Sequence, residues 1–198
     1  MKTRDLFSTN SSTHEEVTNE TFVRVADYIP DIVVDLRYAT TDNFTGQRLY
    51  DFTEAWLRYG TTLKLLKAQE ILRKQGYGLK IWDAFRPVAA QFVMWEIYPD
   101  DTFIANPIKG YSWHSRGNTV DVTIVDQNGA ELLMPTPFDN FFYQEKRKFN
   151  EEEQKEVSRN FHLLQDTMVA AGFRPYEDEW WHFYDLDEYE VEQNFRPD

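Results

Sequence analysis

The chain has 198 residues, a length that favours one compact domain over two. Its 41% hydrophobic and 16% aromatic content is typical of a globular protein and excludes a disordered or fibrous chain. The net charge of -13 disfavours binding to nucleic acid or to anionic membranes, whose phosphates would repel the chain. Cysteine is absent, so disulfides are excluded and any metal site must use histidine and carboxylate ligands.

The N-terminal residues carry no recognisable targeting signal. Residues 1–20 are polar and lack hydrophobic periodicity, which predicts a flexible arm before a domain over residues 21–198. The arm lacks the run of about 7 or more apolar residues that a signal peptide needs. No later window approaches the ~18 apolar residues of a membrane span. We therefore expect a cytoplasmic protein with no nucleic-acid or membrane partner, and the sequence does not indicate its oligomeric state.

Hydrophobic periodicity predicts both strands and helices in the first half of the chain. Residues 22–38 contain short β-branched runs and predict a strand or an extended segment. Apolar residues between 54 and 75 recur at helical spacing, and Gly76 follows them as a helix cap. Residues 78–83 alternate as in a strand, and a helix is expected from Pro87 to about residue 97.

The second half of the chain continues this mixture. A loop is predicted over residues 99–112, and a strand over 118–125 in which Asp121 faces away from the apolar residues. Residues 143–157 are rich in charge and predict a solvated face or a flexible segment. A helix over 161–171 and a terminal strand over 181–184 complete the expectation. The order of elements indicates an α+β fold, a single domain with a small antiparallel sheet flanked by helices.

Two of the four histidines are candidates for metal ligands, because His114 and His182 lie in aromatic-rich segments. Gly117 permits a sharp turn into the strand that carries Asp121, so His114 and Asp121 can reach one point. Together with His182 they would supply three nitrogen and oxygen ligands. A catalytic zinc ion needs such a set, with the fourth position open. The alternative interpretation is that His182 is an ordinary buried histidine.

Three consecutive acids, residues 177–179, precede His182, and a carboxylate beside a metal could take a proton from water. All three are carboxylic acids, so their chemistry alone does not identify which one would act as the base. Residues three apart on a strand face opposite sides, so Glu179 qualifies only if it lies in a bend. Arg86, at a predicted strand-to-helix corner, could stabilise an oxyanion, or could simply pair with Asp83.

Several segments of the sequence resemble a known family. They are YATTDNFTG (38–46), QGYGLKIWDAFRP (75–87), SWHSRGNTVDVT (112–123), MPTPFDNF (134–141) and GFRPYEDEWWHF (172–183). In order and approximate spacing they resemble the VanX-type D-alanyl-D-alanine dipeptidases, zinc peptidases of family M15. The resemblance covers roughly residues 22–185 and implies the Hedgehog/D,D-peptidase fold.

The resemblance implies one zinc ion per chain, bound by His114, Asp121 and His182. It selects Glu179 over its neighbours as the general base and later the general acid. Arg86 matches the arginine that stabilises the transition state in this family.

Substrate contacts are implied as well. Ser112 would contact the carboxylate of the substrate, while Asp139 and Tyr38 would receive the ammonium group of a dipeptide. The implied reaction is zinc-dependent hydrolysis of D-Ala-D-Ala to free D-alanine by metal-activated water.

Two alternatives stay open. A D,D- or L,D-carboxypeptidase that acts on peptidoglycan peptides would use the same chemistry in a wider cleft, whereas Asp139 with Tyr38 favours a closed amine pocket. A catalytically silent metal- or peptide-binding protein, or a structural zinc protein, is the second alternative. A structural zinc site usually has a fourth cysteine or histidine ligand, for which the sequence offers no candidate.

Overall fold

The computed structural model describes residues 16–101, 103–140 and 154–197. In this part of the chain, a five-stranded sheet has the order β2-β4-β5-β7-β6, and β1 pairs with β3 in a smaller sheet. The strands are β1 (Phe22–Arg24), β2 (Val33–Val34), β3 (Trp56–Arg58), β4 (Gly78–Asp83), β5 (Thr119–Val125), β6 (Phe173–Pro175) and β7 (His182–Asp185). The helices are α1 (Val25–Tyr28), α2 (Tyr59–Arg73), α3 (Val88–Ile97) and α4 (Lys155–Ala171), with 3-10 helices η1 (Arg37–Ala39) and η2 (Trp113–Arg116).

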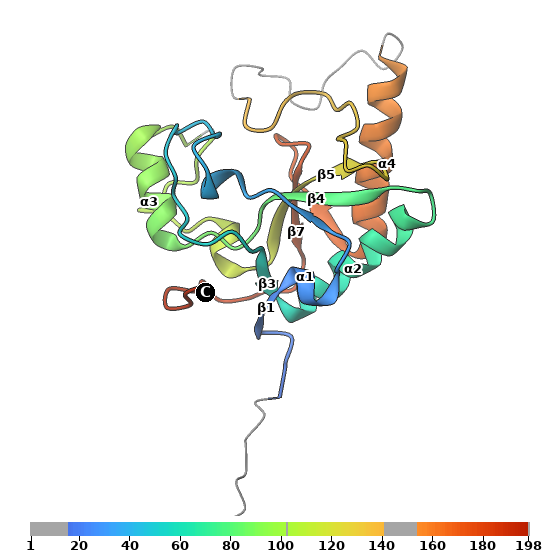
Figure 1. The fold of residues 1–198 in the computed structure, drawn as a ribbon. Helices are drawn as coiled ribbons and strands as arrows, with labels where there is room; N and C mark the ends of the chain where they lie inside the picture. The colour runs from blue at the N-terminus through green and yellow to red at the C-terminus, as the bar shows by residue number, and fades with distance from the viewer. Residues whose placement is uncertain (1–15, 102, 141–153, 198) are drawn as a thin grey trace, which may run out of the picture.

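The larger sheet is antiparallel from β4 through β5 and β7 to β6, and the short edge strand β2 adds one parallel pair with β4. Helices α2 and α4 pack against each other beside the sheet, while α3 lies on the far side of the sheet from them (Figure 1). The predicted α+β fold, with a small and largely antiparallel sheet flanked by helices, is confirmed.

Strand β5 runs through the middle of the sheet, and all seven of its residues are buried. Apolar side chains of β4, β5, α2 and α4 form the core beside it, with no exposed surface at Leu79, Ile81, Val122, Ile124, Leu65, Leu72, Leu164 and Met168. Full burial of each such side chain contributes about 1.5–3 kcal/mol to folding. The core therefore gives β5 a rigid position, and with it the polar residues on its other face.

The predicted helix over residues 54–75 is wrong in its first turn. Residues Trp56–Arg58 are extended and pair with Phe22–Arg24, and α2 begins only at Tyr59. Apolar periodicity could not reveal this, because the strand partner lies far away in the sequence. The helix also ends at Arg73, two residues before the predicted end, and Gly76 lies in the turn that follows with a φ of 81°.

Most other elements lie close to their predicted positions. Strand β4 and the end of α3 are as predicted, and β5 and β7 each begin one residue later than predicted. Helix α4 is longer than predicted, since it begins at Lys155 rather than at residue 161, and Gly172 ends it with a φ of 110°. Strand β6 was not predicted, because three residues are too short for a period to show.

The segment over residues 22–38 is less regular than predicted. It contains β1 and β2, but the short helix α1 separates them and η1 follows. Residues 1–15 of the predicted arm and residues 143–153 of the charged stretch lie outside the described residues. Residues 155–157, at the end of that stretch, belong to the first turn of α4.

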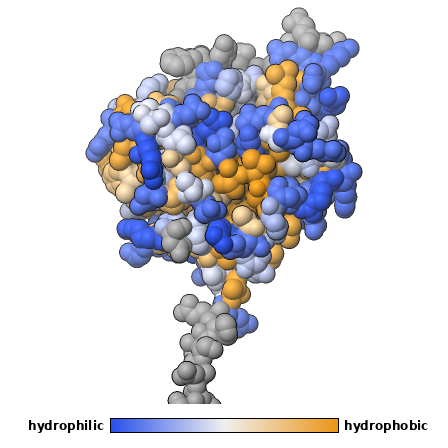
Figure 2. Space-filling view, in the orientation of Figure 1, coloured by the Kyte–Doolittle hydropathy of each residue, from blue (hydrophilic) through white to orange (hydrophobic). Residues whose placement is uncertain are grey.

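Hydrophobic residues are unevenly spread over the surface. On the face drawn in Figure 2 they gather near the middle, over the region of β4 in Figure 1, and hydrophilic residues surround them. None of the described helices combines the length and the apolar character needed to cross a bilayer.

Candidate metal centre

A row of polar residues crosses the middle of the sheet. Asp121 on β5 lies opposite His182 on β7 and opposite Asp83 on β4. The register between β4 and β5 shifts between Ile81 and Asp83, so Trp82 is an extra residue in the ladder. This bulge aligns Asp83 with Asp121, because without it Trp82 would occupy that place. Paired residues point to the same face, so the three polar side chains share one side of the sheet.

His114 reaches the same place from η2. The hydroxyl of Ser112 caps this short helix by accepting a hydrogen bond from the N–H of His114. Gly117 then returns the chain to β5 with a φ of 75°, and a Cβ atom there would lie 2.4 Å from a ring carbon of Phe22. Only glycine satisfies both conditions, so the sharp turn predicted at Gly117 is confirmed.

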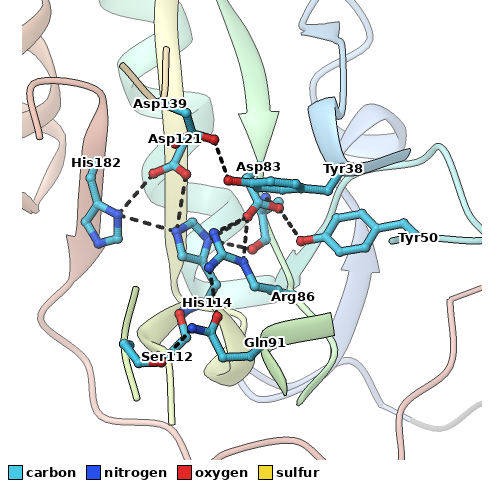
Figure 3. Close-up of polar contacts among 12 residues, drawn as sticks. Tyr38, Tyr50, Asp83, Arg86, Gln91, Ser112, His114, Asp121, Asp139 and His182 are labelled. Atoms are coloured by element: carbon cyan, nitrogen blue, oxygen red, sulfur yellow. Dashed lines mark hydrogen bonds and ion pairs between the residues drawn. The ribbon is translucent and has the colours of Figure 1, made fainter. Parts of the chain in front are cut away.

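The side chains of His114, Asp121 and His182 converge at one point (Figure 3). Nε2 of His114 lies 3.4 Å from Nδ1 of His182 and 3.4 Å from Oδ2 of Asp121. Nδ1 of His182 lies 3.0 Å from Oδ1 of Asp121. Among the described residues, these three form the only such group of histidine and carboxylate side chains.

These separations fit a zinc ion. Tetrahedral zinc with bonds of about 2.0–2.2 Å to nitrogen and oxygen holds its donor atoms about 3.3–3.6 Å apart. Two of the three separations agree with this range, and the third is slightly shorter. Oδ1 of Asp121 is buried and lies 3.0 Å from Nδ1 of His182, so both atoms face the point where a metal ion would bind.

Neighbouring groups set the tautomer of His114 and the ionisation of Asp121. Nδ1–H of His114 donates to the carbonyl of Ala84 at 2.8 Å, so in the neutral imidazole Nε2 carries the lone pair that faces the cluster. Burial alone would raise the pKa of Asp121, but the two histidines outweigh this and hold it well below its usual range. Asp121 is thus ready to bind a cation as a carboxylate.

Glu179 lies in a bend before β7, as its position three residues before His182 requires. Residues 179–182 form a turn in which the N–H of His182 donates to the carbonyl of Glu179 at 3.3 Å. The turn brings Oε2 of Glu179 within 3.5 Å of Nδ1 of His182. The neighbouring Glu177 and Asp178 are exposed. Geometry therefore singles out Glu179 among the three consecutive acids.

Arg86 is buried and pairs with Asp83, the partner considered from the sequence. Oδ2 of Asp83 accepts hydrogen bonds from Nε and Nη2 of Arg86 at 3.0 and 2.7 Å. Burial alone would lower the pKa of Arg86, but the charge of Asp83 outweighs it and raises the pKa well above its usual value. The guanidinium also lies 5.2 Å from the ring centre of Tyr38. Arg86 also lines the cavity at the cluster, so its pairing with Asp83 does not remove it from the site.

Asp139 and Tyr38 form a second polar pair beside the cluster (Figure 3). The hydroxyl of Tyr38 donates to Oδ2 of Asp139 at 2.5 Å. Burial raises the pKa of Asp139 to about 8; the Tyr38 hydrogen bond acts against this rise, and the charges of Asp121 and Glu179 add to it. Without a cation nearby, Asp139 holds a proton at neutral pH.

A cavity of about 340 Å³ joins these features. Its lining includes all eight residues singled out from the sequence: Tyr38, Arg86, Ser112, His114, Asp121, Asp139, Glu179 and His182. The volume is near the lower end of the ~300–1,000 Å³ range of ligand pockets, so the cavity suits a small substrate. Asp101 and segment 103–105, after α3, complete the lining together with the aromatic side chains of Trp113, Tyr176 and Tyr184.

Sequence reasoning missed two polar residues of this network. The hydroxyl of Tyr50 donates to Oδ1 of Asp83 at 2.8 Å, and Oε1 of Gln91 accepts from Nη1 of Arg86 at 2.8 Å. Asp83 was a candidate because it lies three residues before Arg86. Tyr50 had no comparable signal, since its contact spans 33 residues. Gln91 had none because it lies in a helix of apolar composition.

The stability of the zinc-free protein should depend on the ionisation of Asp139. The folded protein keeps a proton that the unfolded chain releases, because the pKa rises from 3.8 to about 8 on folding. Its contribution to the free energy of unfolding is therefore lost as the pH rises from about 4 to about 8. Asp139→Asn should remove this part of the pH dependence, as measured by urea unfolding across that range. Asparagine also tolerates the φ of 54° at this position. An unchanged pH dependence in the variant would contradict the assignment.

Two histidines and an aspartate that converge in a small cavity, with a carboxylate and an arginine beside them, define a candidate metal-dependent hydrolase. The Peptidase_M15 family, D-ala-D-ala dipeptidase, matches residues 18–197 of the chain. The chain belongs to this family.

Individual relatives agree with the family. The D-alanyl-D-alanine dipeptidase of Escherichia coli (strain K12) is 34% identical over 161 residues, which are 81% of this chain and 82% of that protein. The D-alanyl-D-alanine dipeptidase of Enterococcus faecium is 33% identical over 174 residues, covering 78% of this chain and 86% of that protein. A solved structure, VanYB in complex with D-Alanine-D-Alanine, matches with a TM-score of 0.44 and 14% identity, covering 67% of this chain and 73% of that chain.

Proposed function

We propose that this protein hydrolyses the dipeptide D-Ala-D-Ala to free D-alanine in a zinc-dependent reaction. Membership of the family and the names of the relatives supply the substrate class. The observation that carries the proposal is that all eight residues implied by the family resemblance line one small cavity.

In this proposal His114, Asp121 and His182 hold one zinc ion per chain. The separations of their donor atoms and the burial of Asp121 support this assignment. A bound zinc ion would lower the pKa of water and polarise the carbonyl of the substrate.

Glu179 acts as the proton carrier. Its Oε2 lies beside Nδ1 of His182, so a carboxylate at this place accepts the proton of the attacking water and later passes it to the leaving amine. Arg86 faces the same cavity with its plane held by Asp83. A fixed guanidinium stabilises the negative oxygen that develops during the attack, without having to reorganise first.

The charges of the lining suit a dipeptide with both ends free. Four carboxylate side chains and one arginine line the cavity: Asp101, Asp121, Asp139, Glu179 and Arg86. The excess of negative charge suits a metal cation together with the ammonium group of the substrate. An ammonium group beside Asp139 favours its ionised form. An acylated substrate offers no cation to Asp139 and loses this favourable contact, which disfavours longer peptides. The hydroxyl of Ser112 is a donor for the carboxylate end.

We also propose that residues 21–198 form the dipeptidase domain and that residues 1–20 are an arm. The family match over residues 18–197 supports one continuous domain. Near the boundary, the carbonyl of Thr21 accepts a hydrogen bond from the N–H of Tyr59 at 2.8 Å, which joins this part of the chain to α2. A cytoplasmic location stays a prediction from the sequence.

Release of D-alanine from D-Ala-D-Ala by the zinc-loaded protein tests the function. We expect hydrolysis of the free dipeptide and no hydrolysis of N-acetyl-D-Ala-D-Ala, because the acetyl group removes the charge that Asp139 receives. Cleavage of the acetylated substrate would instead assign a carboxypeptidase. If the protein binds zinc and cleaves neither substrate, it is a binding protein and the proposal is wrong.

A further inference from the structure

Gln91 is a buried polar residue of α3 with only 1% of its surface exposed. Both ends of its amide are engaged. Oε1 accepts a hydrogen bond from Nη1 of Arg86 at 2.8 Å, and Nε2 donates to the carbonyl of Ala105 at 2.7 Å. Figure 3 shows Gln91 next to Arg86, on the side away from Tyr38. This amide therefore links the arginine of the cavity to the segment that forms one of its walls.

The two partners of Arg86 hold different edges of its guanidinium. Asp83 binds Nε and Nη2, and Gln91 binds Nη1. A planar group that is held at one edge can still swing about that edge. The second contact removes this freedom, and a displacement of about 1 Å in a catalytic group can cost as much as about 10²-fold in rate.

The chemistry of an amide suits this place better than that of a carboxylate. Asp83 already balances the single positive charge of Arg86. A second carboxylate would make the group negative overall, which opposes a negative charge that develops in the substrate. Glutamine orients the guanidinium without adding charge. A carboxylate would also be unable to donate to the carbonyl of Ala105.

Ala105 belongs to segment 103–105, whose residues line the cavity together with Arg86. We propose that Gln91 is a positioning residue that holds Arg86 in its orientation and ties it to this wall of the cavity. The inference rests on the proposed function, in which Arg86 stabilises the transition state. Gln91 does not itself line the cavity, so a residue outside the lining would help to set the rate of hydrolysis.

Gln91→Met tests the proposal, because methionine keeps the length of the side chain and removes both hydrogen bonds. We expect kcat for D-Ala-D-Ala to fall about 10- to 100-fold, with a smaller change in KM and unchanged zinc content. The matched control is Gln69→Met. Gln69 is another buried glutamine with two hydrogen bonds, to Asp31 and to the N–H of Leu79. This control should lose stability and keep its kcat. A kcat loss of the same size in both variants would overturn the proposal.

A double-mutant cycle separates positioning from a general structural role. If Gln91 acts through Arg86, adding Gln91→Met to Arg86→Ala should cost little further activity. The same fold-loss in both backgrounds would overturn the proposal. Gln91→Glu serves as a second variant if Gln91→Met does not fold, because it keeps an acceptor for Arg86. Its added charge and the loss of the donor to Ala105 should also lower kcat, and a kcat equal to wild type would overturn the proposal.

Hydrogen exchange of the Arg86 side-chain N–H groups, followed by NMR in the zinc-free protein, does not depend on activity. We expect faster exchange in Gln91→Met than in wild type and no change in Gln69→Met. Unchanged exchange in Gln91→Met would overturn the proposal. If wild type fails to hydrolyse D-Ala-D-Ala, the proposed function is wrong, while the exchange rates still decide whether Gln91 holds Arg86.

Discussion

Replacement of Glu179 by glutamine should lower kcat for D-Ala-D-Ala about 10²- to 10⁴-fold, the range for loss of a general acid–base group. Glutamine keeps the size of the side chain, but its amide does not accept a proton at neutral pH. Glu179 lies beside His182 and is not one of the three clustered donors, so the variant should still bind one zinc ion. Steady-state kinetics with measurement of the zinc content of the same sample test both parts.

The neighbouring acids provide matched controls for this experiment. Glu177→Gln and Asp178→Asn remove the same charge from exposed positions next to Glu179. Both variants should keep a kcat near that of wild type. Equal losses in all three variants would show that the acidic segment acts through its general charge. Loss of zinc from Glu179→Gln would make Glu179 a metal ligand instead of a base.

Asp121→Asn should abolish activity through the loss of zinc. Asp121 contacts both histidines of the cluster, and an amide in its place removes the negative charge that a cation needs. Changes around the ligands of a metal typically lower its affinity about 10- to 100-fold, so loss of a ligand should exceed this. Calorimetric titration with zinc measures the affinity directly. The melting temperature of wild type should rise with added zinc, whereas that of the variant should not.

A control for Asp121→Asn lies just beyond the end of the same strand. Asp126 caps the turn after β5 by accepting hydrogen bonds from the N–H groups of Asn128 and Ala130. Asp126→Asn should reduce stability slightly and leave the zinc affinity unchanged. If Asp121→Asn binds zinc as tightly as wild type does, Asp121 is not a ligand and the proposed site loses its third donor.

Local features of the sequence were enough to predict much of the fold. The end of α4 at Gly172 was predictable, because a left-handed residue after a run of helical spacing is a local requirement. Strand β4 was predictable from its alternation. The start of α2 was not, because residues 56–58 become a strand only through pairing with residues 22–24. Pairing between distant segments leaves no trace in local periodicity.

The candidate site divides in a similar way. The types and spacing of His114, Asp121 and His182 carry the metal chemistry, and the sequence alone determined these candidates and the acids before His182. Which acid faces the cluster was decided by the turn over residues 179–182. That turn depends on where β7 begins, and therefore on its pairing with β5.

The sequence by itself thus determined the fold class, the candidate donors and the local turns, because each depends on residue type and short-range spacing. The tertiary structure alone decided the bulge at Trp82, the hydrogen bond from Gln91 to the carbonyl of Ala105, and the place of segment 103–105 in the cavity wall. Each of these features needs strands and loops that are distant in sequence to meet at defined distances. Packing of the whole core sets those distances, and no single segment contains that information.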